Sequence, residues 1–122
     1  MREVRMRILI VDDESELIKL YRDILTKFGY SVDFALNGEE AVKSYEKAYN
    51  KGERFDCVIM DYRMPTKDGL EAMREILKLD KIGKIIFASA DDSIEKEALK
   101  LGAKAFLKKP FGIDTLIGAL RA

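Results

Sequence analysis

The stretch Ile8-Leu-Ile-Val-Asp-Asp13 places four large apolar residues directly before two aspartates. A run this short and this apolar is typical of a strand that is buried on both faces, as in a parallel sheet. Four further apolar runs follow along the chain, and longer segments separate them. The five expected strands therefore cover residues 7–11, 31–36, 57–60, 84–88 and 105–107.

The segments between these strands carry apolar residues at helical spacing. In the first segment they recur three or four positions apart from Leu17 to Phe28, and Gly29 follows, a common residue just after a helix. The second begins with Asn37-Gly-Glu-Glu40, which is similar to a capping box, and should end near Asn50. Three more helical patterns lie within residues 70–77, 94–101 and 113–120.

Strand and helix thus alternate five times along the chain. We predict one α/β domain over residues 1–122, with a doubly wound five-stranded parallel sheet between two helical layers. This three-layer sandwich would bind its ligands beyond the carboxyl ends of the strands, at the point where the strand order reverses. The polar residues expected at those ends are Asp12, Asp13, Asp61, Ser89 and Lys109.

The overall composition excludes several classes of protein. The 22 basic and 22 acidic side chains cancel, so no broad basic field is available for nucleic acid or an anionic membrane. Residues 1–7 are charged and the next apolar run is short, which argues against a signal peptide and favours a cytoplasmic protein. Cys57 is expected to be a buried strand residue. The absence of Gln and His and the 36% charged residues indicate a thermophilic source.

Three carboxylates are expected to meet at one edge of the sheet. Asp12 and Asp13 end the first strand and Asp61 ends the third, so they converge if these strands are neighbours. Like charges at close range raise one another's pKa, and such a cluster needs a cation or a proton. Mg²⁺ prefers oxygen ligands, whereas zinc is nearly excluded in a chain with no His and one Cys. We therefore predict a Mg²⁺ site.

Two further groups extend this constellation. Lys109 ends the fifth strand, where its ammonium could neutralise a carboxylate or a phosphoryl oxygen. Ser89 follows the fourth strand with a hydroxyl that can donate to a phosphoryl oxygen. An aspartate can act as a nucleophile at phosphorus, and Asp61 is the best-placed candidate. Taken singly, Asp13 could serve a helix N-terminus, Ser89 a strand end and Lys109 an exposed edge, but their joint placement favours a site.

The pattern resembles the response-regulator receivers over essentially the whole chain. The marks are the Asp12-Asp13 pair, the segment Asp61-Tyr-Arg-Met-Pro-Thr-Lys-Asp-Gly69, Ser89 before Ala90, and Lys109 before Pro110. The resemblance implies a flavodoxin-like strand order of 2-1-3-4-5. It also implies that Asp61 becomes an aspartyl phosphate in a two-component or phosphorelay system, with a sensor histidine kinase or a phosphotransfer protein as the donor.

The resemblance assigns metal ligands to individual residues. It implies that Asp12 and Asp13 help to bind Mg²⁺, and that Asp61 is both a ligand and the phosphoacceptor. The main-chain carbonyl of Arg63 would complete the protein ligands. Mn²⁺ would be able to replace Mg²⁺ at such a site.

The resemblance also points to residues that read and tune the phosphorylated state. Ser89 and Phe106 hold the positions of the family's switch residues, which alter the face formed by the fourth helix, fifth strand and fifth helix. Phe106 lacks the hydroxyl of the tyrosine that can occupy this position. Arg63 and Asp91, each two residues after a site residue, are expected to flank the phosphoryl site and pair across it, which would obstruct an attacking water.

The predicted function is a phospho-accepting receiver that is no enzyme beyond self-catalysed transfer and slow dephosphorylation. It would signal to an unidentified effector as a monomer or a phosphorylation-dependent dimer. It either stands alone, as in chemotaxis or a phosphorelay, or is the receiver of a larger, for example DNA-binding, regulator. Two alternatives are less favoured. A Mg²⁺-dependent phosphatase would have a D-x-D pattern after the first strand, and a flavin-binding module would have Ser, Thr or Gly where Asp12-Asp13-Glu14 stands.

Overall fold

A computed structural model describes residues 5–122 as alternating strands and helices. The strands are β1 Arg7–Val11, β2 Ser31–Ala35, β3 Cys57–Met60, β4 Ile85–Ser89 and β5 Ala105–Lys108. The helices are α1 Ser15–Lys27, α2 Gly38–Asn50, α3 Gly69–Leu79, α4 Glu95–Leu101 and α5 Ile113–Arg121, with a short 3₁₀ turn at Asp92–Ile94 before α4.

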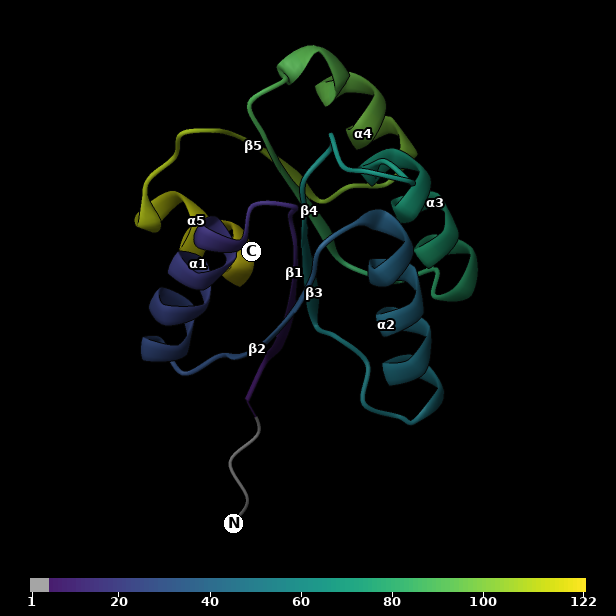
Figure 1. Ribbon diagram of the computed structural model, residues 1–122, viewed down its shortest axis with the longest axis horizontal. Helices are drawn as coiled ribbons and strands as arrows, with labels where there is room; N and C mark the ends of the chain where they lie inside the picture. The colour runs from purple at the N-terminus through teal and green to yellow at the C-terminus, as the bar shows by residue number, and fades with distance from the viewer. Residues whose placement is uncertain (1–4) are drawn as a thin grey trace.

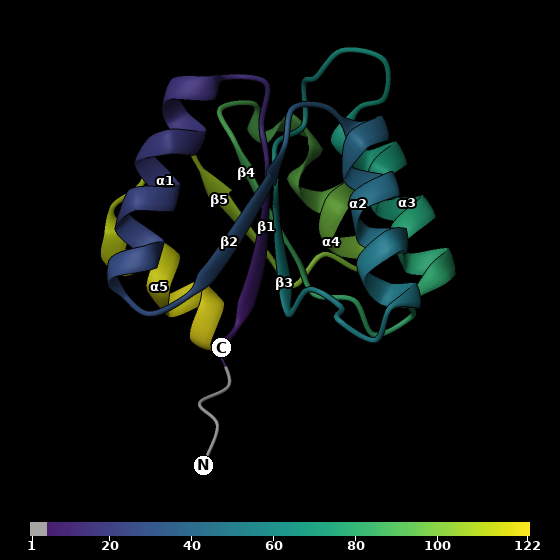
Figure 2. The ribbon, with the colours of Figure 1, turned by 60° about the horizontal axis from the view of Figure 1, so that its bottom comes forward.

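The five strands form one parallel sheet in the order β2-β1-β3-β4-β5. Helices α1 and α5 cover one face and α2, α3 and α4 cover the other, so the molecule has three layers (Figures 1 and 2). The predicted α/β class, the doubly wound sheet and its strand order are confirmed. Across the residues that the structure describes, no helix is both long and apolar enough to cross a bilayer.

The alternation of side chains on the central strands divides the core in two. On β1, Ile8 and Ile10 pack toward α1 and α5, whereas Leu9 and Val11 pack toward α2 and α3. These residues are fully buried because the strand lies in the middle of the sheet and helices cover both faces. Cys57 is buried in the same layer as Ile8, as predicted, and burial raises the pKa of its thiol to about 12.

The ends of two helices follow from local capping. The Asn37 side chain accepts a hydrogen bond from the Glu40 amide at 2.8 Å, which confirms Asn37 as the N-cap of α2. The reciprocal bond differs from that of a capping box, because the Glu40 carboxylate accepts from the Asn37 side-chain amide at 3.0 Å and not from its main-chain amide. Asp68 caps α3 in the same way by accepting from the Glu71 amide. Gly29 follows α1 with a φ of +92°, a conformation that favours glycine.

Three strands differ from their expected bounds, among them β5, which extends to Lys108. β4 begins at Ile85 and includes Ser89, and β2 ends at Ala35, which leaves Leu36 exposed. Helices cover both faces of the sheet as predicted, but the two edge strands are less buried than the central ones, with Ala35 alone buried in β2 and Leu107 alone in β5. β2 is an edge strand that pairs with β1 on one side, and Figure 2 shows it at the open margin of the sheet.

Candidate functional site

Three carboxylates meet at the carboxyl edge of the two central strands. Asp12 follows β1 and is 2% exposed, Asp13 is exposed, and Asp61 follows β3. The Asp61 amide donates to the Val11 carbonyl at 3.0 Å, so the β1–β3 pairing itself brings Asp61 beside Asp12. One carboxylate oxygen from each aspartate lies within 4.8 Å of the others. The predicted convergence of Asp12, Asp13 and Asp61 is therefore present.

Lys109 brings a positive charge to this cluster from the end of β5. Its ammonium donates to Asp12 Oδ2 at 2.9 Å and lies 3.7 Å from Asp61 Oδ1. Its main-chain amide donates to the Ser89 carbonyl at 2.9 Å, which ties it to the end of β4. The bond between Lys109 and Pro110 is cis. The lysine thus contacts the metal-ligand candidates directly, as predicted.

The electrostatics of the cluster are set by burial and by excess negative charge. Burial raises the pKa of Asp61 to about 6, the charges of Asp12 and Asp13 raise it as well, and Lys109 and the Tyr62 amide lower it. One lysine cannot neutralise three carboxylates, so the site favours a further cation. The available donors are hard carboxylate oxygens in a chain without His, a set that fits Mg²⁺ and not zinc.

The cluster opens into a hollow of about 520 Å³. Ser89 is 3% exposed at the end of β4, and its hydroxyl accepts a hydrogen bond from the Asp91 amide at 3.1 Å. A hydroxyl that accepts can still donate its own proton, here toward a group in the hollow. The hollow is lined by Asp13, Glu14, Asp61, Arg63, Ser89, Ala90, Asp91 and Lys109.

Arg63 and Asp91 form the ion pair predicted across the rim of this hollow. Arg63 Nη2 and Nε donate to Asp91 Oδ2 at 2.8 and 3.3 Å. Hydrogen bonds from Ser93 and Arg63 lower the pKa of Asp91 to about 2, so the carboxylate stays charged. The pairing is present, whereas its effect on an aspartyl phosphate and the role of the Arg63 carbonyl as a metal ligand stay predictions.

Phe106 lies on β5 away from the hollow. Its partly buried ring stacks on the ring of Phe87, with 6.4 Å between centroids and 12° between planes. Phe87 is fully buried on β4, two residues before Ser89. The two switch candidates are thus joined through β4, and their switching role stays a prediction.

Three residues lie at the site although the sequence did not predict this role for them. Glu14 lines the hollow, although only its closeness to Asp13 could have signalled this. Tyr21 on α1 stacks on Phe111 at 6.1 Å, and burial, followed by the charges of Asp12 and Asp61, raises its pKa to about 12. At Gly69 a Cβ atom would collide with the main-chain oxygen of Asp61, so the start of α3 packs directly under the phosphoacceptor candidate.

A comparison with family models identifies the chain. The model of the response regulator receiver domain matches residues 8–121. The chain belongs to this family. The family that the motifs around Asp61 and Lys109 predicted is therefore confirmed.

The chain is similar to chemotaxis proteins, response regulators and transcriptional regulators. It is 42% identical to the chemotaxis protein CheY of Thermotoga maritima over 117 residues, which are 93% of each chain. It is 35% identical to the response regulator TrrA of Thermotoga maritima, solved in complex with Mg²⁺ and BeF, with a TM-score of 0.85 and coverage of 95% and 96%. It is 39% identical over 85% of its length to the probable transcriptional regulator ycf27 of Cyanidium caldarium, of which it spans 40%.

Proposed function

We propose that this receiver accepts a phosphoryl group on Asp61 and so carries a signal in a two-component or phosphorelay system. The observation that carries the proposal is the position of the Lys109 ammonium, 2.9 Å from Asp12 and 3.7 Å from Asp61, in an acidic cluster that opens to solvent. The phosphoryl donor would be a phosphohistidine of a sensor kinase or of a phosphotransfer protein.

Each residue of the site has a task in this transfer. A carboxylate oxygen of Asp61 forms the new bond to phosphorus as the bond from phosphorus to the donor nitrogen breaks, and the electron pair leaves with that nitrogen. The Tyr62 amide holds Asp61 Oδ1 at 2.9 Å, which leaves Oδ2 as the attacking atom. The Lys109 ammonium offsets charge on the transferring group, and the Ser89 hydroxyl donates to one of its oxygens.

The acidic cluster is the proposed metal site. Asp12, Asp13 and Asp61, with the Arg63 main-chain carbonyl, would hold Mg²⁺ or Mn²⁺. When bound, such a cation supplies positive charge to the phosphoryl oxygens. It also removes the mutual repulsion of the three carboxylates.

The signal would leave through the face formed by α4, β5 and α5, where Phe106 lies next to Phe87. The partner there would be a downstream effector, and the receiver would act in the cytoplasm as a monomer or a phosphorylation-dependent dimer. We propose no catalytic turnover of small phosphate esters, only self-catalysed transfer and slow dephosphorylation. The match to a regulator of which the chain spans 40% supports a second candidate role, as the receiver of a larger DNA-binding regulator.

The test is incubation with acetyl phosphate, with and without Mg²⁺, followed by intact-mass measurement. The wild type should gain the mass of one phosphoryl group when Mg²⁺ is present, and Asp61→Asn should gain none. Asp23→Asn, an exposed aspartate on α1, is the matched control and should behave as the wild type. A wild type that gains no Mg²⁺-dependent adduct would overturn the proposal, and turnover of p-nitrophenyl phosphate would support the phosphatase alternative.

A further inference from the structure

The charges of this receiver are separated along the axis of the sheet. All five helices have an acidic residue in the first turn and a basic residue in the last turn. In a parallel sheet with helical crossovers the helices run opposite to the strands, so their first turns lie at the phosphorylation site and their last turns at the other end. The charges in the end turns of the helices are therefore sorted by sign between the two ends of the sheet, although Arg63 and Lys109 lie at the first end and Asp56 at the other.

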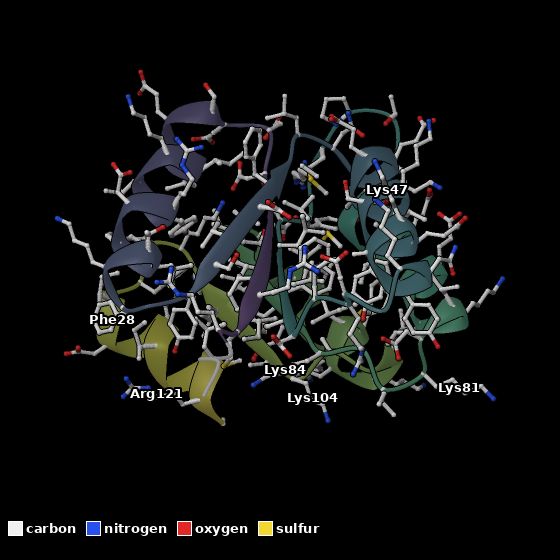
Figure 3. The ribbon with its side chains drawn as sticks, turned by 90° about the horizontal axis from the view of Figure 1, so that it is seen from below. Phe28, Lys47, Lys81, Lys84, Lys104 and Arg121 are labelled. Carbon is white, nitrogen blue, oxygen red and sulfur yellow. The ribbon has the colours of Figure 1, made fainter. Side chains whose placement is uncertain are left out.

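The basic end is most developed around the loop between α3 and β4. Lys78, Lys81 and Lys104 are exposed there and, within residues 5–122, none of them forms an ion pair. The nearby Asp80 does not offset them, because it is buried and accepts two hydrogen bonds from Arg54. Figure 3 shows Lys84 and Lys104 near each other at this end of the molecule and Lys81 farther along the margin, with Lys81 and Lys104 extending outward.

An exposed isoleucine follows Lys81 in the loop between α3 and β4. Ile82 is 76% exposed, the largest exposed fraction among the large apolar residues that are described as exposed. Together with Lys81, it lines both of two neighbouring hollows. One hollow, of about 410 Å³, has Leu77 and Leu101 on its walls and Lys81 and Lys104 at its rim. The other, of about 480 Å³, combines Tyr49 and Leu79 with Lys78.

We propose that this end of the receiver, defined by Lys78, Lys81, Ile82 and Lys104, binds an acidic polypeptide segment with two apolar side chains. One apolar side chain would enter each of the two hollows that Ile82 lines, and the acidic side chains would pair with the lysines. A peptide fits better than a lipid surface, because a flat bilayer would leave both hollows unfilled. It fits better than nucleic acid, because four of the side chains that line the hollows, Leu77, Leu79, Ile82 and Leu101, are aliphatic and cannot stack with bases.

The proposed surface is distinct from the phosphorylation site. No residue that lines the two hollows also lines the hollow around Asp61. The phosphorylation site lies at the carboxyl ends of the strands, and the proposed surface lies at their amino ends. Leu101, the last residue of α4, is the one lining residue that belongs to the signalling face, whereas Lys78, Lys81, Ile82 and Lys104 lie outside its helices and strand. Binding at the basic end should therefore be largely independent of phosphorylation. The surface would hold the receiver near an acidic partner in both signalling states.

The test is fluorescence anisotropy of the full chain with the labelled peptide Glu-Leu-Asp-Glu-Leu-Asp at low salt. We expect saturable binding that weakens as salt rises. The double variant Lys81→Glu with Lys104→Glu should lose about tenfold or more in affinity, and Ile82→Ser should lose affinity without a charge change. The matched control, Lys19→Glu with Lys96→Glu, reverses two exposed lysines elsewhere and should bind as the wild type. Circular dichroism checks that each variant is folded.

Further measurements distinguish an acidic peptide from a lipid surface or nucleic acid as the ligand of this surface. A peptide with Ser in place of Leu should bind at least several-fold more weakly, and acetyl phosphate with Mg²⁺ should leave the affinity of the Leu peptide unchanged. Vesicles of phosphatidylglycerol and a single-stranded DNA oligonucleotide are measured under the same conditions. Failure of the Leu peptide to bind, equal loss in both double variants, or tighter binding of vesicles or DNA would overturn the proposal. The three outcomes that would overturn the proposal are all measured without acetyl phosphate, so they do not depend on whether Asp61 is phosphorylated.

Discussion

Asp61 is a weaker acid than an ordinary aspartate because of where β3 ends. Burial raises its pKa to about 6, and the neighbouring Asp12 and Asp13 add to the effect. A carboxylate that is costly to keep charged gains more from a cation than an exposed one does. The same environment that makes Asp61 a good metal ligand therefore makes the metal-free receiver sensitive to pH.

The pH dependence of stability has a definite sign. The pKa of Asp61 is about 6 in the folded chain and near 3.8 when unfolded. Below pH 3.8 Asp61 is protonated in both the folded and the unfolded chain, so it does not destabilise the fold. Above about pH 6 it is charged in both, and the full free-energy cost of burying its charge lowers the stability of the folded chain. In metal-free buffer, the thermal midpoint of the wild type relative to Asp61→Asn should therefore fall as the pH rises through this window. If the thermal midpoints of the wild type and of Asp61→Asn change in parallel with pH, the prediction is contradicted. At about pH 6 and above, added Mg²⁺ should raise the midpoint of the wild type again.

The ion pair between Arg63 and Asp91 should control the lifetime of the aspartyl phosphate. It lies on the rim of the hollow, where it would obstruct an attacking water. Replacing both residues by Ala should shorten the lifetime by about fivefold, which corresponds to ~1 kcal/mol of the barrier. Phosphate release from the purified phosphorylated protein measures this.

The exposed pair between Lys108 and Asp92 provides a matched control for this experiment. It is an ion pair of 3.1 Å between the last residue of β5 and the 3₁₀ turn before α4, but neither residue lines the hollow. Lys108→Ala with Asp92→Ala should leave the lifetime unchanged. An unchanged rate in the Arg63 and Asp91 double variant would reject the obstruction argument.

At the scale of elements, α2 packs unusually closely on the loop between β3 and α3. A Cβ atom at Gly38 would collide with the main-chain oxygen of Lys67, and a backbone atom cannot move aside as a side chain can. Gly38→Ala should therefore lower the free energy of unfolding by about 2 kcal/mol. Gly118→Ala in α5, where a Cβ atom meets nothing within 4 Å, should raise it by about 0.5–1 kcal/mol. Urea unfolding that gives both variants the same sign would contradict this account.

A second link between elements runs through the buried Asp80 at the end of α3. Its Oδ2 accepts hydrogen bonds from the Tyr45 hydroxyl at 2.6 Å and from Arg54 at 2.6 and 2.9 Å. Asp80→Ala should lower the free energy of unfolding by about 2–4 kcal/mol, because Tyr45 and Arg54 would lose their partner. Asp23→Ala on the surface of α1 should change it by less than about 0.5 kcal/mol. A loss of similar size in both variants, measured by urea unfolding, would contradict this.

The elements differ in how far sequence alone could predict them. Central strands, caps such as Asn37, and the residues after each strand follow from patterns along the chain. The exposure of β2 could not be predicted in this way, because an apolar run does not reveal whether the strand lies at the edge of the sheet. Thr66 is a further case: its φ is +66°, a conformation that β-branched residues rarely adopt. The contact between Lys109 and Asp12 joins residues 97 positions apart: the strand ends predicted that Lys109 lies near the carboxylates, and the structure shows that Asp12 is the one it contacts most closely.

At the scale of the whole molecule, the topology turns helix-end preferences into a charge separation. Acidic first turns and basic last turns each complement a helix dipole. Because all five helices point the same way, these local preferences add up along the axis of the sheet. This arrangement would favour the proposed cation at one end and the proposed acidic partner at the other.

The same abundance of charge leads to a prediction about heat stability. Exposed ion pairs such as Lys43 with Glu39 and Arg74 with Glu97 contribute about 0–1 kcal/mol each at 25 °C. The desolvation penalty of such pairs falls as temperature rises, so they contribute more in the heat. We predict a thermal midpoint above ~65 °C in metal-free buffer at neutral pH, beyond the range of ordinary mesophilic domains. Calorimetry with added salt is the control, since screening should lower the midpoint if ion pairs are responsible. A midpoint of about 45–65 °C would contradict the inference of a thermophilic source.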